Sequence, residues 1–317
     1  MARLGRGRGP LPPFVSMMPV VPNGAPRFVE ESHGQGAGWL GPMLNPMRID
    51  ADASKPDYKV GDFSLHADVP ENRSDQRREL LADIDRQLRT LEGHANIAAT
   101  RSHYDRAFSL LSSRGAVEAF DLTREPQSIR ERYGMNPHGQ SVLQARRLVE
   151  AGVPFVTVFW PNDGITNVSV YWDTHNRNFI DLKTRLCPVT DQAFSALLDD
   201  LQERGMLDET LIVWTGEMGR TPRVGQGVVG GAGAGKDGRD HWPSCFTSIL
   251  AGGGVQRGIV YGSSDRFAAY PASNPTSPAD LAATIYHCLG VAPHLQLTDH
   301  LNRPLTICEG SPIHAIL

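Results

Sequence analysis

Three short polar segments in the second half of the sequence contain the residue types that bind divalent metal ions. They are Trp172-Asp173-Thr174-His175, Gly216-Glu217 and Arg239-Asp240-His241. Carboxylates and neutral imidazoles are suitable ligands for Zn²⁺, Mn²⁺ and similar ions. We therefore expect a divalent metal ion (Zn, Ca, Mg or Mn) whose ligands come from Asp173, His175, Glu217, Asp240 and His241.

The spacing within these segments is compatible with convergence on one ion. Asp173 and His175 are two residues apart, so both side chains share a face if the backbone is extended. Glu217 follows a glycine, which permits a sharp turn and close backbone approach. Asp240 and His241 are adjacent and would face opposite ways in an extended segment. One of them can then bind metal while the other orients a ligand or a substrate group.

Two arginines beside these segments indicate an anionic partner. The guanidinium groups of Arg220 and Arg239 are suited to an oxyanion such as phosphate or sulfate. A metal-free alternative remains open, in which Asp240 caps a turn and His241 is an ordinary loop histidine. In that alternative Glu217 pairs with Arg220 or Arg239. The coincidence of three polar segments at three strand edges favours the metal site, because sites are recognised by convergence.

These segments adjoin the clearest predicted strands. The apolar run 154–160 is typical of a parallel strand covered on both faces, and 210–214 and 246–251 predict two further strands. The first two polar segments follow strands, and the third precedes the 246–251 strand. Ligands of open α/β sheets bind outside the carboxyl ends of the strands. We therefore expect the site at that edge of the sheet.

The other elements alternate in a way that indicates a doubly wound α/β sheet. An apolar run over 14–21 predicts a strand that ends in an Asn23-Gly24 turn. Helices are predicted over 74–91, 102–112, 113–120, 140–151, 191–204 and 277–289, the last capped by Ser277. The first 150 residues contribute few strands, and a missing N-terminal part of the fold would explain that shortage.

The chain is expected to form a single domain over residues 1–317, with two unusual segments. Residues 1–73 are rich in turn formers and predict a loop-rich region with a short strand at 63–65. Residues 225–238 hold seven glycines. They differ from a phosphate-binding loop, because Lys236 is followed by Asp237 rather than Ser or Thr. We expect a flexible insertion there.

Composition excludes several classes of protein. A net charge of −4 gives no basic face for nucleic acid. The sequence has no stretch of 18 apolar residues, so we expect no membrane span. The four cysteines are scattered and form no Cys-x-x-Cys pair, which argues against a thiolate zinc site or a disulfide framework.

Several segments taken in order resemble one bacterial family. These are Phe155-Val156-Thr157-Val158, Trp172-Asp173-Thr174-His175, Leu207-Asp208-Glu209-Thr210-Leu211-Ile212-Val213-Trp214, Gly216-Glu217-Met218-Gly219-Arg220-Thr221-Pro222, Gly238-Arg239-Asp240-His241-Trp242-Pro243, Leu250-Ala251-Gly252-Gly253-Gly254 and Ala282-Ala283-Thr284-Ile285-Tyr286-His287. Together they resemble the family catalogued as domain of unknown function 1501, of the alkaline phosphatase and sulfatase superfamily. The resemblance extends from about residue 5 to residue 316.

The resemblance implies an α/β fold, an alkaline-phosphatase-like three-layer sandwich with a mostly parallel central sheet. It also implies one or two divalent metal ions. Asp173 and His175 would match one metal-binding pair, Glu217 the next acidic ligand, and His241 the late histidine ligand with Asp240 beside it. The implied activity is metal-dependent hydrolysis of sulfate or phosphate esters. The substrate would be a small anionic ester or a sulfated glycan, and the location periplasmic or otherwise extracytoplasmic.

Two departures from the family pattern affect these expectations. The chain starts downstream of the export signal, the first core strand and the nucleophile region, so we expect an N-terminally truncated chain with its catalytic residues unassigned. Met218 stands where related enzymes often carry His or Asn, which puts a second metal site in question. Whether the chain is an enzyme stays open. The alternative is a non-catalytic extracytoplasmic binding or structural protein that retains the fold.

Overall fold

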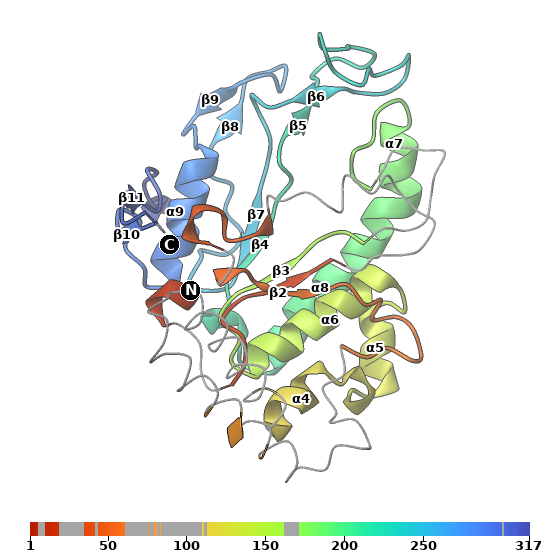
Figure 1. Ribbon diagram of the computed structural model, residues 1–317. Helices are drawn as coiled ribbons and strands as arrows, with labels where there is room; N and C mark the ends of the chain where they lie inside the picture. The colour runs from red at the N-terminus through yellow and green to blue at the C-terminus, as the bar shows by residue number, and fades with distance from the viewer. Residues whose placement is uncertain are drawn as a thin grey trace. The chain divides into compact units, whose positions relative to one another are not determined.

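The computed structural model describes residues 1–5, 10–18, 35–41, 44–60, 113–161, 171–299 and 301–317, and the isolated positions 76, 79, 80, 83 and 110. The described residues up to Pro161 form one compact unit, and those from Tyr171 to Leu317 form another. The two units are described separately below (Figure 1).

The first unit is built on a small parallel sheet in the order β2-β1-β3. Its strands are β1 (Val15–Met17), β2 (Met47–Ile49) and β3 (Val156–Val158). Val15 is aligned with Met47 on one side and with Val156 on the other. The strand predicted at 14–21 is present over Val15–Met17, and residues 19–21 and the predicted Asn23-Gly24 turn lie outside the described residues. The strand predicted at 154–160 is present as β3 with the expected parallel pairing, and it is half-buried rather than covered on both faces. Strand β2 was missed, because three residues between turn formers are too few to show a period.

Three helices of the first unit lie on one side of this sheet, as Figure 1 shows. They are α4 (Arg114–Phe120), α5 (Gln127–Tyr133) and α6 (Pro137–Glu150). Asn136 caps α6 by accepting a hydrogen bond from the Gly139 N–H at 2.9 Å, and Pro137 occupies the first turn. This cap explains why the helix begins before the predicted residue 140. The core beneath the helices includes Val15, Ile49, Phe120 and Leu148.

The helices of the second unit follow the predicted pattern with earlier starts. Helix α7 (Asn178–Asp181) continues through a π-turn, η6 (Leu182–Leu186), into α8 (Cys187–Glu203). The sequence predicts α8 from residue 191, but Pro188 is accepted in its first turn and the helix begins at Cys187. Helix α9 (Pro278–Cys288) has the predicted Ser277 cap, and Asp280 completes a capping box.

The strands of the second unit form antiparallel pairs. The pairs are β4 (Ile212–Trp214) with β7 (Ile249–Ala251), β5 (Gly219–Arg220) with β6 (His241–Trp242), β8 (Ser263–Ser264) with β9 (Pro271–Ser273), and β10 (Gln296–Thr298) with β11 (Pro304–Thr306). The predicted strands at 210–214 and 246–251 are present as β4 and β7. They pair antiparallel, and β4 is half-buried rather than fully buried.

Short 3-10 turns complete the described elements: η1 (Ala2–Leu4), η3 (Gly38–Leu40), η5 (Leu122–Arg124), η7 (Leu207–Glu209) and η8 (His314–Ile316). Most of the predicted helix over 74–91 lies outside the described residues, although Gln76, Glu79, Leu80 and Asp83 are helical. The predicted strand at 63–65 lies outside them entirely, as does most of the predicted helix at 102–112.

The part of the chain that the structure describes has mixed helix and strand content with a small parallel sheet. Among these residues, no helix has both the length and the apolar character needed to cross a membrane.

Candidate metal centre

The segment before α7 carries Asp173 and His175 and is held in place by hydrogen bonds at both of its ends. The Thr174 hydroxyl donates to the Asn178 side chain at 2.7 Å, and Thr174 is buried. The His175 carbonyl accepts from the Asn178 N–H and from the Arg239 N–H, both at 3.1 Å. The second bond ties this segment to the residues that precede β6.

The pairing of β5 with β6 presents the other two side chains of the site. Arg220 is aligned with His241 across the antiparallel pair. Directly opposed residues of an antiparallel pair point to the same face. Both side chains reach Asp173 from there.

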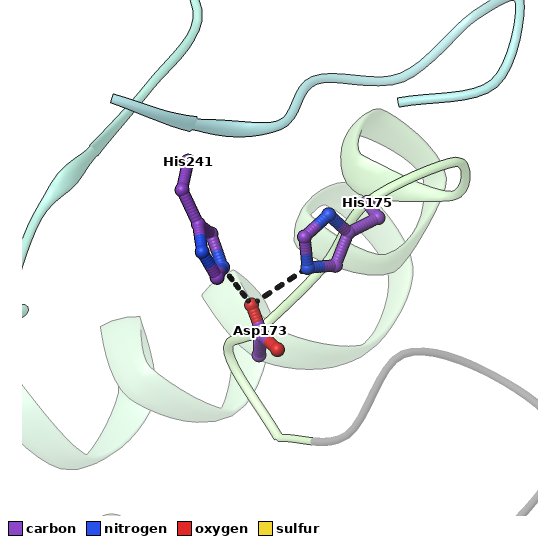
Figure 2. Close-up of side chains that lie close together, drawn as sticks. All are labelled: Asp173, His175 and His241. Carbon is purple, nitrogen blue, oxygen red and sulfur yellow. Dashed lines mark hydrogen bonds and ion pairs between the residues drawn. The ribbon is translucent and has the colours of Figure 1, made fainter. Parts of the chain in front are cut away.

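The side chains of Asp173, His175 and His241 converge, as Figure 2 shows. Asp173 Oδ1 lies 2.9 Å from His175 Nε2 and 2.7 Å from His241 Nε2. One ligand atom of each residue lies within 4.8 Å of the others. Asp173 and His241 are 68 residues apart in sequence, so tertiary folding brings this trio together.

The backbone around His175 determines the hydrogen bonding of one of its two ring nitrogens. Its Nδ1 lies 3.0 Å from the Gly233 carbonyl oxygen, an acceptor, so Nδ1 carries a proton. In the neutral ring Nε2 then has a lone pair, and it faces a carboxylate oxygen. Lone pair against lone pair is unfavourable unless a proton or a metal cation lies between them. The contact with Asp173 is therefore favourable when the ring is charged or a cation is bound, and the bond to Gly233 is the one that a neutral, metal-free ring keeps.

Asp173 is ionised in this setting. Partial burial raises the pKa of Asp173, but hydrogen bonds from His241 and Arg220 and the nearby charges of His175 and Arg220 outweigh it. The resulting pKa lies below the usual range of an aspartate. Its side chain remains 53% exposed, so a cation or an anionic substrate has access to the carboxylate from solvent.

Asp240 was expected among the metal ligands, but its carboxylate is buried and hydrogen-bonded to main-chain N–H groups. It is fully buried, and its Oδ2 accepts from the N–H groups of Val228 at 2.9 Å and Gly233 at 3.2 Å. Its Oδ1 accepts from the His241 N–H at 2.9 Å. Burial raises the pKa of Asp240, and the three backbone donors lower it further than burial raises it. Asp240 is thus a buried carboxylate behind His175, with its Oδ1 3.5 Å from His175 Nδ1.

The two arginines are placed differently. Arg220 Nη2 donates to Asp173 Oδ1 at 3.1 Å and to the Trp172 carbonyl at 3.0 Å, while its buried Nη1 has no hydrogen-bond partner among the described residues. Arg239 instead donates to the Pro222 carbonyl at 3.4 Å and stacks over the Phe179 ring. The structure brings Arg220 into the cluster with Asp173 and gives Arg239 other partners.

Glu217 is exposed and is not a member of the group of converging ligand atoms. The pairing of Glu217 with Arg220 in the metal-free alternative is replaced by the pairing of Arg220 with Asp173. The role of Glu217 as a ligand stays a prediction.

Sequence reasoning missed Gly233, whose carbonyl sets the proton position of His175, and Thr221, which is fully buried and hydrogen-bonded to Asp240 in both directions. The only sequence signal for Gly233 is the density of glycines over 225–238. Backbone carbonyls carry no signature of their own in a sequence.

The fold and the site define a mixed helix-and-strand protein with an accessible Asp–His–His cluster able to receive a divalent cation. A family model matches residues 1–317, and its description is "Protein of unknown function (DUF1501)". The chain belongs to this family. No curated protein and no solved structure matched it.

Proposed function

We propose that the protein is a metal-dependent hydrolase of sulfate or phosphate esters whose ion is held by Asp173, His175 and His241. The observation that carries the proposal is the approach of two imidazole nitrogens to one oxygen of an ionised carboxylate, at 2.7 and 2.9 Å. With Nδ1 of His175 protonated toward Gly233, Nε2 is the nitrogen available to a cation.

The donor set has a chemical preference. Two imidazoles and one carboxylate suit Zn²⁺ or Mn²⁺ better than Ca²⁺ or Mg²⁺, which favour all-oxygen surroundings. Three protein ligands with an exposed carboxylate also leave room for a substrate oxygen, as catalytic rather than structural zinc sites do. A bound divalent ion would act as a Lewis acid toward the oxygens of an ester.

Arg220 would bind the anionic part of the substrate. Its Nη2 already donates to Asp173, and its Nη1 is buried without a partner among the described residues. A buried donor left unsatisfied is costly, and a sulfate or phosphate oxygen would satisfy it. Arg239 and Glu217 remain candidates for a second anion contact and a further metal ligand.

The family resemblance supports the rest of the proposal. It includes an alkaline-phosphatase-like three-layer sandwich, membership of the alkaline phosphatase and sulfatase superfamily, and an extracytoplasmic, for example periplasmic, location. The expected substrate is a small anionic ester or a sulfated glycan.

Metal analysis of the purified protein tests the proposal directly. We expect about one divalent ion per chain in the unmodified protein, and its loss in Asp173→Ala and in His241→Ala. Asp208→Ala is the matched control, because this exposed carboxylate pairs with Arg257 away from the cluster. Protein that carries no divalent ion in the presence of Zn²⁺ or Mn²⁺ contradicts the metal site. Glu217→Ala, measured alongside, shows whether Glu217 is a ligand.

A second candidate function is a non-catalytic binding or structural protein that keeps the fold. The same short contacts favour it in one respect: protonated His175 and His241 would each donate a hydrogen bond to Asp173, and the trio would then need no metal ion. A panel of aryl sulfates and aryl phosphates separates the two functions. Turnover that a chelator abolishes supports the hydrolase, and metal binding without turnover of any panel member supports the binding protein.

A further inference from the structure

The glycine-rich segment 225–238 is folded around one buried side chain, Asp240. A Cβ atom added at Gly231 would lie 2.5 Å from Asp240 Oδ2 and 2.8 Å from Oδ1. The segment is closed at its base by a hydrogen bond from the Gly225 N–H to the Gly238 carbonyl at 2.9 Å. The flexibility of this segment stays a prediction. Its backbone packs around the carboxylate of Asp240.

Further glycines of this segment pack on the backbone that carries His175. A Cβ atom at Gly238 would lie 2.0 Å from the His175 carbonyl oxygen, and one at Gly235 would lie 3.0 Å from Asn176 Cβ. Close backbone approach of this kind is open to glycine alone. The glycines therefore let the segment lie directly against the metal-binding residues.

Gly233 joins the carboxylate of Asp240 to the ring of His175. The Gly233 N–H donates to Asp240 Oδ2 at 3.2 Å, and the Gly233 carbonyl accepts from His175 Nδ1 at 3.0 Å. Val228 donates to the same carboxylate oxygen at 2.9 Å, and Thr221 holds the Asp240 backbone on the other side. Gly233 is thus hydrogen-bonded both to the buried carboxylate of Asp240 and to the imidazole of His175.

We propose that Asp240 is a positioning residue that folds the glycine-rich segment and, through Gly233, holds His175 with its proton on Nδ1 and its Nε2 directed at Asp173. The effect on metal affinity rests on the proposed function. The effect on the His175 proton does not, because it is a property of the metal-free protein.

Two glycines in this segment provide a matched test pair. Both Gly227 and Gly231 lie outside the set of residues with positive φ. A Cβ at Gly231 would collide with Asp240, which three backbone donors hold in place, whereas a Cβ at Gly227 would lie 3.9 Å from Asp240 Oδ2. Gly231→Ala should therefore displace the carboxylate and Gly227→Ala should not.

The first measurement is the position of the His175 proton by ¹H–¹⁵N correlation NMR of metal-free, ¹⁵N-histidine-labelled protein. Spectra are recorded at about pH 9, which is above the pKa of ~6.5 of an ordinary imidazole. The His175→Gln variant is used to assign the signals of His175. We expect the Nδ1–H tautomer in the unmodified protein and in Gly227→Ala, and a mixture of tautomers in Gly231→Ala and Asp240→Ala.

If Asp240→Ala does not fold, the spectrum of Gly231→Ala tests the proposal by itself. A retained Nδ1–H tautomer in Gly231→Ala overturns the proposal, and so does an equal change in Gly227→Ala.

The second measurement is Zn²⁺ affinity by titration of the same proteins. We expect about 10- to 100-fold weaker binding in Gly231→Ala and Asp240→Ala, the usual effect of losing an outer partner of a histidine ligand. Gly227→Ala should bind as the unmodified protein does. Weaker binding by Gly231→Ala with an unchanged tautomer overturns the positioning role. If the unmodified protein binds no Zn²⁺, the proposed function fails, and the tautomer comparison still decides the role of Asp240.

Discussion

Each unit of the chain contains a cluster of charged side chains, and the two clusters are built in opposite ways. In the first unit, Arg146 and Glu125 are 0% and 5% exposed, and Arg146 Nη2 lies 2.9 Å from Glu125 Oε2. Arg147 contacts the other oxygen of Glu125. In the second unit, the carboxylate of Asp173 is 53% exposed and faces imidazole nitrogens.

The two clusters differ in burial and in the kind of group that faces the carboxylate. Arg146 and Arg147 are permanent cations that face two carboxylates, Glu125 and Glu150, so that cluster is matched in charge without any further partner. Asp173 already pairs with one permanent cation, Arg220, whereas the two imidazole nitrogens face its oxygen favourably only when they carry a proton or share a cation. A cluster that is open to solvent and incomplete without a cation is suited to binding, whereas a closed, buried cluster holds the fold.

The largest effect is expected where the closed cluster is broken. Glu125→Ala removes the buried carboxylate beside Arg146 and leaves it only the ion pair with the more exposed Glu150. It should lower the free energy of unfolding by about 3 kcal/mol. Urea denaturation measures this change. Arg257→Ala is the control, since its ion pair with Asp208 is exposed and should contribute at most about 1 kcal/mol. Equal losses in the two variants would contradict a structural role for the buried cluster.

The pH dependence of stability should also depend on Glu125. Burial raises the pKa of Glu125, and its bonds and ion pairs with Arg146 and Arg147 lower it below the ordinary value of 4.5. A group with a depressed folded pKa stabilises above its unfolded pKa, and that stabilisation is lost as the pH falls through the folded pKa. The stability difference between the unmodified protein and Glu125→Gln should therefore be constant above about pH 5 and shrink below about pH 4. A difference that does not depend on pH would show that folding leaves the pKa of Glu125 unchanged.

A smaller effect is expected at Arg220, which belongs to the open cluster. Arg220→Gln removes the cation beside Asp173 and should weaken binding of inorganic phosphate to the metal-loaded protein by about tenfold, the effect of one charged hydrogen bond. Isothermal titration calorimetry measures the affinity. Arg266→Gln is a control, because Arg266 stacks over Phe267 instead of joining this cluster. Unchanged phosphate binding by Arg220→Gln would exclude Arg220 as the anion contact.

The smallest effect is expected on the stability of the metal-free protein when the open cluster is changed. Asp173→Asn keeps the shape of a half-exposed side chain and removes its charge, so the free energy of unfolding should change by less than about 1 kcal/mol. The same denaturation experiment as for Glu125→Ala gives the comparison. A loss as large as that of Glu125→Ala would mean that the Asp173 cluster is structural.

The local elements could largely be predicted from the sequence, because their signals lie within a few residues. Ser277, Pro278 and Asp280 predict the start of α9 through capping and the helix dipole, and all three have the expected places. The apolar run at 154–160 predicts a strand in a parallel sheet, and β3 is one. Strand pairing over long distances was less accessible, since β2 is three residues long and β4 pairs antiparallel with β7.

The convergence of three residues of the candidate site was predicted, and the hydrogen bonding around them was not. Asp173, His175 and His241 were expected to converge, and they do. Asp240 was expected among the ligands, and its oxygens face the backbone of the glycine-rich segment. Whether an acidic side chain binds a metal or holds a loop depends on the donors around it, and here those donors are main-chain N–H groups.

The sequence by itself determined the chemistry available to this protein: carboxylates, imidazoles and arginines beside predicted strands, with a run of glycines between two of them. Tertiary structure alone decided their roles. It brought His241 and Arg220 to Asp173 through the pairing of β5 with β6, and it wrapped the glycines around Asp240. The physical reason is that ligation and hydrogen bonding depend on the direction and distance of atoms, which side-chain type does not specify.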